Sequence, residues 1–161
     1  MKAKTEEAIL RRRERLPLHH IDTSVLIEAQ KDTKLGDACA DYLNRVGYKY
    51  RGVVSSSVLG EFLLVTLRDM PKPEDRELAI KILEDFIQKR SIVYATPAMK
   101  AYHIAVRIAE LDPRVENADA LHYAVAVQEN ASTFVTLDTA LIGHKTLEKE
   151  FGVRVTHPSD L

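Results

Sequence analysis

The chain has 161 residues, of which 45% are hydrophobic and 29% are charged, and its formal net charge is -1. This length fits one domain with a sizeable core, and this composition excludes an intrinsically disordered protein. The single cysteine, Cys39, excludes an intrachain disulfide. No apolar run approaches the roughly 20 residues of a membrane helix, and no secretory signal is visible. We therefore expect a cytoplasmic globular protein.

The amino-terminal segment is basic, and we expect it to form a helical extension. Residues 1–15 contain more Lys and Arg than Glu, whereas the rest of the chain has an excess of acidic residues. A basic arm can hold a polyanion near an acidic site. The alternative is a solvated helix in which Glu7 and Arg11 pair at i,i+4. Pro17 should end this helix, so we expect the folded domain to span residues 16–161.

Beyond this extension, short β-branched segments alternate with helical patterns. Strands are expected over residues 18–21, 51–55, 91–95, 133–136 and 153–156. Helices are expected from residue 22, over 35–46, from Ser56 to Leu67, after Pro73, after Pro97, over 118–130 and over 139–150. Short strands separated by helices indicate a parallel sheet that is covered on both faces. The prediction is an α/β fold, a three-layer α/β/α sandwich with a central parallel sheet of about four to five short strands.

Polar residues mark the expected helix starts, and the apolar spacing marks the faces expected to be buried. The candidate capping residues are Thr23 or Ser24, the pair Ser56 and Ser57, and Asn117. In the long helix after Pro73, the face expected to be buried consists of Leu78, Ile82, Leu83, Phe86 and Ile87.

Four acidic residues stand where a strand gives way to a helix, or on a helix that is otherwise apolar. They are Asp22, Glu61, Asp119 and Asp138. Carboxylates in apolar surroundings are costly to bury unless they are neutralised, and a hard divalent cation neutralises several carboxylate oxygens at once. In parallel sheets, ligands bind outside the carboxyl ends of the strands, where the strand order reverses. We therefore predict an acidic metal site for phosphoryl-transfer chemistry at this edge.

Each of these acids also has a purely structural interpretation. Asp138 can cap a helix, and the helix dipole alone favours Asp119 in a first turn. Asp22 is harder to explain in this way, because the hydroxyl residues that follow it are the more natural caps. Glu61 is the hardest, because its neighbours on that helix face are apolar. The adjacent Gly60, which is unfavourable inside a helix, suggests that another group approaches the backbone closely.

The order of these motifs resembles that of PIN-domain nucleases, and in particular the VapC-type toxin ribonucleases of prokaryotic toxin–antitoxin pairs. The resemblance runs from about Leu18 to Pro158. It rests on Asp22-Thr23-Ser24 after the first strand, Glu61 on an apolar helix, Asp119-Ala120-Leu121-His122, and Thr136-Leu137-Asp138. One departure is the stretch before Leu18, since such proteins usually begin almost at the first strand.

The resemblance implies an endoribonuclease that hydrolyses RNA with Mg²⁺ or Mn²⁺. The catalytic and metal-binding residues that it implies are Asp22, Glu61, Asp119 and Asp138, with Thr136 and either Thr23 or Ser24 in support. Our hypothesis is that Asp22 and Asp119 are the principal ligands, while Glu61 and Asp138 complete the shell or orient the attacking water. The resemblance further implies a homodimer and a small antitoxin protein that holds the enzyme inactive.

Two rival mechanisms fit the residues poorly, and two other functions stay open. A metal-free ribonuclease would use two histidines as acid and base, but the histidines lack paired spacing, and we interpret His122 as a partly buried residue on a face next to that of Asp119. An aspartyl phosphatase of the haloacid dehalogenase type needs a second Asp two positions after Asp22, where Ser24 stands. The other two are a stand-alone RNA-processing nuclease and a non-catalytic module that binds RNA or protein.

Overall fold

The computed structural model describes residues 14–161, so the helical extension expected over residues 1–15 lies almost wholly outside the described residues. The strands are β1 (Leu18–Ile21), β2 (Arg51–Ser55), β3 (Val93–Ala95), β4 (Thr133–Val135) and β5 (Arg154–Thr156). The helices are α2 (Thr23–Glu28), α3 (Lys34–Arg45), α4 (Ser56–Asp69), α5 (Pro73–Arg90), α6 (Met99–Leu111), α7 (Asn117–Gln128), α8 (Lys145–Phe151) and a short 3-10 turn (Pro158–Asp160).

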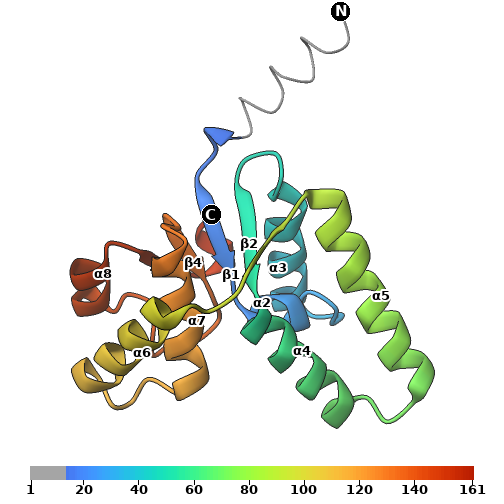
Figure 1. Ribbon diagram of the computed structural model, residues 1–161. Helices are drawn as coiled ribbons and strands as arrows, with labels where there is room; N and C mark the ends of the chain where they lie inside the picture. Colours follow the sequence, from blue (N-terminus) through green and yellow to red (C-terminus); the bar gives the residue numbers. More distant parts are fainter. Residues whose placement is uncertain (1–13) are drawn as a thin grey trace, which may run out of the picture.

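The five strands form one parallel sheet in the order β3-β2-β1-β4-β5. Helices α2 to α5 cover one face, and α6 to α8 cover the other (Figure 1). This arrangement confirms the predicted three-layer α/β/α sandwich. The chain moves from β1 towards β3 on one side and from β4 to β5 on the other, so the direction of the connections reverses between β1 and β4. Parallel sheets place their ligand sites at such a reversal, outside the carboxyl ends of the strands.

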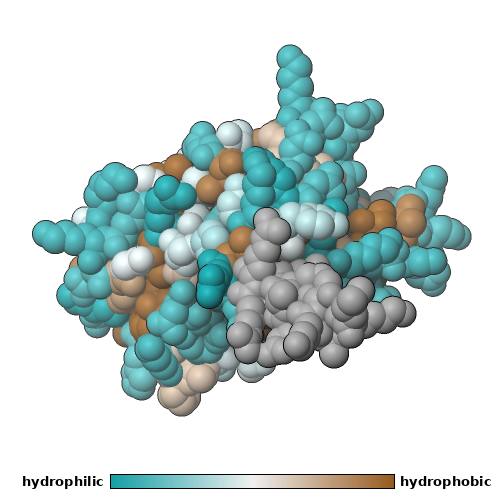
Figure 2. Space-filling model, turned by 90° about the horizontal axis from the view of Figure 1, so that it is seen from above, coloured by the Kyte–Doolittle hydropathy of each residue, from teal (hydrophilic) through white to brown (hydrophobic). Residues whose placement is uncertain are grey.

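Each face of the sheet has its own hydrophobic core. Val53 and Phe134 pack with α6, α7 and α8, whereas Ile21, Val54 and Val135 pack with α2 to α5. Because successive side chains of a strand point to opposite faces of the sheet, the adjacent residues Val53 and Val54 belong to different cores, as do Phe134 and Val135. Viewed from above, most of the visible surface is hydrophilic, with hydrophobic side chains in small groups (Figure 2). Among residues 14–161, no helix combines the length and the apolar character needed to cross a membrane.

Several expected helix caps are misplaced by one or two residues. Helix α4 is capped by the side chain of Ser55, which accepts a hydrogen bond from the amide of Val58, instead of by Ser56 or Ser57. Helix α7 has Glu116 at its N-cap position, without a side-chain cap bond, so the expected cap at Asn117 is also wrong. A cap is decided by local backbone geometry, which a run of adjacent polar residues does not specify.

The helix expected over residues 139–150 begins later than predicted. Residues 139–143 form turns, and α8 starts at Lys145 with the side chain of His144 as its cap. Two local features explain the delay. The carboxylate of Asp138 accepts a hydrogen bond from the amide of Ala140 at 2.8 Å, and Gly143 has a φ of +74°, in the left-handed region that interrupts a helix.

The apolar faces of α4 and α5 are only partly covered. In α5, Leu83 and Ile87 are buried as expected, but Leu78 is 57% exposed and Ile82 is 47% exposed. In α4, Leu64 is 69% exposed. In Figure 1, α4 and α5 run in opposite directions, and the turn that joins them lies far from the sheet. Exposed apolar side chains gathered in one place commonly mark a surface that a partner covers.

The two histidines of β1 are buried residues of the sheet. His19 stacks on Tyr50 with ring centroids 4.1 Å apart, and its Nδ1 lies 3.2 Å from the hydroxyl of Tyr42. His20 is fully buried beside Phe134. Burial lowers the pKa of His19 to about 4 and that of His20 to about 3, each reinforced by a nearby positive group. Both imidazoles are therefore neutral near pH 7, and their burial keeps these two residues from serving as the acid–base pair of a metal-free ribonuclease.

Gly60 lies in open space, so the expectation that another group approaches its backbone is wrong. A methyl group at this position would meet no described atom within 4 Å beyond its chain neighbours and the adjacent backbone of its own helix. We predict that Gly60→Ala stabilises the protein by about 0.5–1 kcal/mol, because Ala loses less conformational freedom than Gly in a helix. The measurement is urea unfolding followed by circular dichroism.

Gly143→Ala is the matched control for this prediction. Its surroundings are equally open, but its φ of +74° is unfavourable for alanine, so this variant should lose roughly 1 kcal/mol. A loss of stability in Gly60→Ala would show that the glycine is required in α4 for a reason other than space.

Candidate metal centre

Asp22 lies at the carboxyl end of β1, beside β4, where the direction of the connections reverses. Its amide continues the ladder by donating to the carbonyl of Val135 at 3.0 Å. It occupies the N-cap position of α2, yet its side chain makes no cap hydrogen bond. The residue is only 3% exposed, so this carboxylate is withdrawn from water and directed to other partners.

Three side chains hold the Asp22 carboxylate. Ser24 Oγ donates to Oδ2 at 2.6 Å, Thr136 Oγ1 donates to the same oxygen at 2.8 Å, and His122 Nδ1 lies 3.1 Å from Oδ1. Thr23, the alternative supporting residue, bonds instead to the carbonyl of Val58 at 3.4 Å. Ser24 and Thr136 are therefore the hydroxyl residues that the structure brings to Asp22.

The same two hydroxyls fix the chain beyond β4. Ser24 Oγ accepts a hydrogen bond from the amide of Leu137 at 3.1 Å, and Thr136 Oγ1 accepts one from the amide of Asp138 at 3.1 Å. The segment that carries Asp138 is thus tied to the residues that hold Asp22. The Asp138 side chain also accepts a hydrogen bond from the amide of Ala140 and so stabilises its own turn. This is a local structural role, similar to the helix-capping role considered from the sequence.

His122 is the residue that the sequence reasoning missed. It is buried, and its Nδ1 lies 3.1 Å from Asp22 Oδ1 and 3.7 Å from Glu61 Oε2. One ligand atom from each of Asp22, Glu61 and His122 lies within 4.8 Å of the others. The sequence interpretation of His122 as a partly buried residue is wrong, because the side chain is fully buried against Asp22. It stands three residues after Asp119 on the same helix, and residues at this spacing are neighbours on a helix surface. That spacing is the signal that could have identified it.

All four predicted acids line one cleft of about 560 Å³. Asp22 and Glu61 belong to the tight cluster with His122, while Asp119 and Asp138 line the same cleft outside that cluster. The side chain of Glu61 is 38% exposed, so it faces the open part of the cleft. Three cationic residues also line the cleft, namely Lys31, Arg68 and Arg114.

The local environment raises the pKa of Asp119 and of His122 and lowers that of Asp22. Burial raises the pKa of Asp119 to about 7, and the charges of Asp22, Asp138 and Glu61 reinforce that rise. For Asp22, burial also acts to raise the pKa, but the hydrogen bonds from His122, Ser24 and Thr136 prevail and lower it. Burial acts to lower the pKa of His122, yet its hydrogen bond to Asp22 and the nearby acids raise it overall.

This donor set fits a hard divalent cation. Carboxylate oxygens are the ligands that Mg²⁺ and Mn²⁺ prefer, and the cleft supplies them from four separate segments. The raised pKa of Asp119 reflects burial and repulsion between neighbouring carboxylates, and a cation among them relieves that repulsion. With its Nδ1 close to Asp22, His122 is placed to orient a carboxylate ligand, as residues next to a metal shell commonly do.

The fold and the cleft define an α/β protein with a carboxylate site at the switch point of its parallel sheet. A family model described as PIN domain matches residues 20–145. The chain therefore belongs to the PIN domain family, which confirms the resemblance expected from the motifs. No curated protein sequence matches the chain.

Solved structures of toxin–antitoxin proteins share this fold. VapBC2 from Rickettsia felis has a TM-score of 0.63 and 19% identity over 87% of this chain and 98% of that one. FitAcB from Neisseria gonorrhoeae has a TM-score of 0.64 and 18% identity over 89% and 99%. VapC20 from Mycobacterium tuberculosis has a TM-score of 0.57 and 16% identity over 75% and 90%. The expected likeness to VapC-type proteins is thus confirmed in the fold.

The cluster predicts a measurable affinity for divalent cations. Mn²⁺ at about 100 times its Kd should stabilise the wild-type protein by roughly 2.7 kcal/mol, which corresponds to a rise in Tm of about 5–10 °C. Asp22→Asn should lose most of this rise, because it removes a central charged ligand. The measurement is differential scanning calorimetry with and without Mn²⁺.

Asp41→Asn is the control, since Asp41 is exposed on α3 and does not line the cleft. It should keep the full Mn²⁺-dependent rise in Tm. An equal rise in Asp22→Asn would exclude this cluster as the metal site.

Proposed function

We propose that this protein is a metal-dependent endoribonuclease that hydrolyses RNA and serves as the toxin of a toxin–antitoxin pair. The observation that carries the proposal is the convergence of Asp22, Glu61, Asp119 and Asp138 on one cleft of a PIN-domain fold. Structural neighbours that include a member of the VapBC family of toxin-antitoxin systems support the toxin role. Because the proposed substrate is RNA, the proposed place of action is the cytoplasm.

The proposed roles follow from how each side chain is held. Asp22 and Asp119 are the principal metal ligands, and the three hydrogen bonds on Asp22 fix its orientation before a cation arrives. Glu61 faces the open cleft and, with Asp138, completes the shell or orients the attacking water. A bound Mg²⁺ or Mn²⁺ would supply charge stabilisation at the phosphate and a more acidic water. His122 positions Asp22 and does not itself touch the substrate.

The shape of the cleft supports a polymeric substrate. It is open to solvent and has cationic residues among those that line it, which suits an extended chain of phosphates. The neighbour VapC20 is described as a Sarcin-Ricin loop cleaving toxin, and this supports RNA as the substrate of the present chain.

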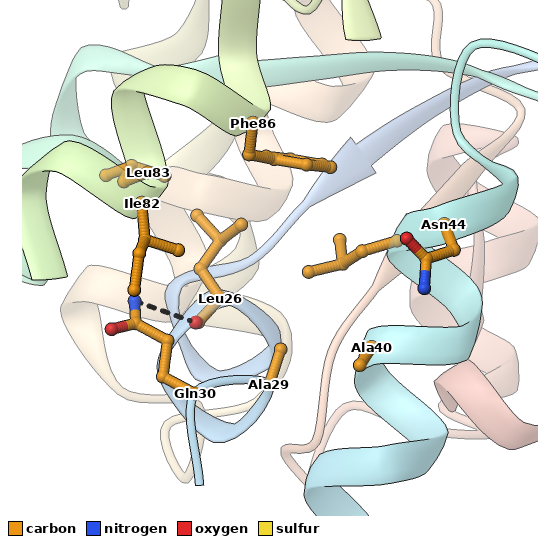
Figure 3. Close-up of a pocket in the computed structure, with 9 residues that line it drawn as sticks. Leu26, Ala29, Gln30, Ala40, Asn44, Ile82, Leu83 and Phe86 are labelled. Atoms are coloured by element: carbon orange, nitrogen blue, oxygen red, sulfur yellow. Dashed lines mark hydrogen bonds between the residues drawn. The ribbon is translucent and has the colours of Figure 1, made fainter. Parts of the chain in front are cut away.

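A separate apolar groove supports the proposed antitoxin partner. Its volume is about 170 Å³, and its residues come from α2, α3 and α5 and the segment just after α2. In Figure 3, Ile82 and Phe86 of α5 lie on one side of Leu26, and Ala40 of α3 lies across from them. The side-chain amide of Gln30 donates to the carbonyl of Leu26 at 3.5 Å and forms a polar edge. A groove of this kind accepts the apolar face of a helical segment.

The proposed homodimer would use other exposed apolar side chains. Leu64 and Leu67 of α4 and Tyr102 and Val106 of α6 are all at least 46% exposed. Exposed apolar side chains of this kind are the ones that a second copy of the chain could cover.

The proposed activity predicts cleavage of RNA that requires both the metal and Asp22. With Mn²⁺, the wild-type protein should cleave a single-stranded RNA, and EDTA should stop the reaction. Asp22→Asn should be slower by roughly 100-fold or more, because the cation loses a ligand that fixes it. The measurement is gel electrophoresis of an end-labelled RNA, with Asp41→Asn as the control that should retain activity.

Equal cleavage by the wild type and Asp22→Asn would contradict the assigned site. RNA binding without any cleavage by the wild type would favour a non-catalytic PIN module.

The toxin role predicts growth arrest that a partner relieves. Expression of the chain alone in bacteria should stop growth, whereas Asp22→Asn should be harmless. Co-expression of a short protein encoded beside this gene should restore growth. Ile82→Asp should still arrest growth but resist that rescue, because a charge in the groove opposes an apolar partner.

Gln88→Asp is the matched control, since Gln88 is exposed on α5 outside the groove. It should be rescued like the wild type. An enzyme that cleaves RNA yet leaves growth unaffected would instead indicate a stand-alone processing nuclease.

A further inference from the structure

The three cationic residues that line the cleft are each paired with a carboxylate. Lys31 pairs with Glu28 at 2.7 Å, Arg68 pairs with its neighbour Asp69, and Arg114 pairs with Asp112 at 2.7 Å. We propose that Arg114 is a phosphate-binding residue that contacts the RNA backbone beside the cleaved bond. This inference rests on the proposed nuclease function and extends it to a residue that none of the catalytic motifs contains.

Asp112 holds the guanidinium of Arg114 in a fixed orientation. Arg114 Nε donates to Oδ1 at 2.9 Å, and Nη2 donates to Oδ2 at 2.7 Å. The amide of Arg114 also donates to Oδ1 at 3.0 Å, which closes a tight turn. Two parallel bonds of this kind fix both the plane and the direction of the guanidinium. Such preorganisation lowers the entropy lost when a ligand binds.

The outer edge of the guanidinium faces solvent. The Arg114 side chain is 85% exposed, and Nη1 has no hydrogen-bond partner among residues 14–161. The fork of Arg matches two oxygens of a phosphate, so this edge can bind a phosphate while the inner edge stays on Asp112.

Asp112 is itself anchored from a second helix. It lies at the end of α6 and is 7% exposed, and His144 Nε2 lies 3.0 Å from its Oδ2. Nδ1 of His144 accepts a hydrogen bond from the amide of Leu147 and caps α8, so Nε2 carries the proton and donates to Asp112. The hydrogen bonds from Arg114 and His144 lower the pKa of Asp112 well below its usual range. Arg114 therefore projects from a support that both α6 and α8 hold.

The other two cations lack this support. Lys31 and Glu28 lie three residues apart at the end of one short helix. Arg68 pairs only with the adjacent Asp69, and both side chains are more than half exposed. Glu28 is better covered and also accepts a hydrogen bond from Thr33 at 3.0 Å, but the Lys31 ammonium meets it without the planar fork of an arginine. Arg68 and Asp69 form a two-bond fork, but no other described residue hydrogen-bonds to the Asp69 side chain, and exposed pairs of this kind are weakly held. The geometry consequently favours Arg114 as the residue with a defined position relative to the acidic cluster.

The excess of negative charge in the cleft explains what Arg114 would contribute to RNA binding. Acidic residues outnumber basic ones among those that line it, so the cleft as a whole repels a phosphate backbone. A fixed cation at its edge attracts the phosphates next to the reacting one and sets their register. Each phosphate contact of this type contributes about one unit to the salt dependence of binding.

Binding of a fluorescein-labelled single-stranded RNA to the Asp22→Asn protein tests this inference, because this variant should cleave RNA too slowly to disturb a binding measurement. The measurement is fluorescence anisotropy in fixed Mg²⁺ over a series of KCl concentrations. Adding Arg114→Gln should weaken binding by about 5–10-fold and reduce the salt slope by about one. Arg114→Lys should keep the slope but bind more weakly than arginine, because it lacks the fork.

Arg107→Gln is the matched control. Arg107 forms exposed ion pairs with Glu110 and Glu150 on α6 and α8, outside the cleft, so its loss should change neither affinity nor slope. Equal binding by the Arg114→Gln and Arg107→Gln proteins, or no RNA binding by any variant, would overturn the role of Arg114.

Metal-dependent cleavage by the wild-type protein is measured separately. Loss of slope in Arg114→Gln without any wild-type cleavage would support the phosphate contact and reject the nuclease.

Discussion

The burial of the Asp22 carboxylate is the constraint on which the rest of the site depends. A buried carboxylate costs several kcal/mol unless hydrogen bonds and positive charge compensate it. Here the compensation comes from Ser24 in α2, Thr136 after β4 and His122 in α7. These partners lie up to 114 residues away in the chain, and they meet only because β1 and β4 are neighbours in the sheet. The acidic site therefore requires this order of strands in the sheet.

This requirement also explains the distribution of charge around the cleft. Asp22 keeps its negative charge because its hydrogen bonds stabilise the ionised form, whereas Asp119 lacks comparable donors and its pKa rises to about 7. The acids are concentrated at the carboxyl edge of the sheet, while Arg114 is held at the edge of the cleft by Asp112, outside the acidic cluster. An acidic centre with a fixed cation beside it suits a ligand that is itself a chain of negative charges.

Sequence patterns predicted the fold and the acidic residues of the cleft, but they predicted poorly the side-chain contacts, the helix starts and the exposure of individual residues. All five strands were predicted because β-branched runs between helices have few other solutions, and the four acids do line one cleft. His122 was missed because its role depends on Asp22, which is 100 residues away. The late start of α8 depends on Gly143 and His144, whose local geometry no periodicity reveals. Leu78 is exposed because the buried stripe of α5 runs through Ala79, Leu83 and Ile87, and amphipathic spacing alone did not distinguish this stripe from its neighbour.

The order in which ligands can enter the cleft follows from the same charges. A phosphate that approaches Asp22, Glu61 and Asp138 meets like charges at short range, and Arg114 alone does not offset them. A divalent cation meets the opposite situation, since it relieves the repulsion that contributes to the raised pKa of Asp119. If the chain binds RNA as proposed, binding of the cation and binding of RNA would favour each other, because each reduces the electrostatic cost of the other. For the proposed RNA substrate, the acidic cluster therefore opposes binding until part of its charge is neutralised, either by a metal ion or by loss of one carboxylate, as in Asp22→Asn.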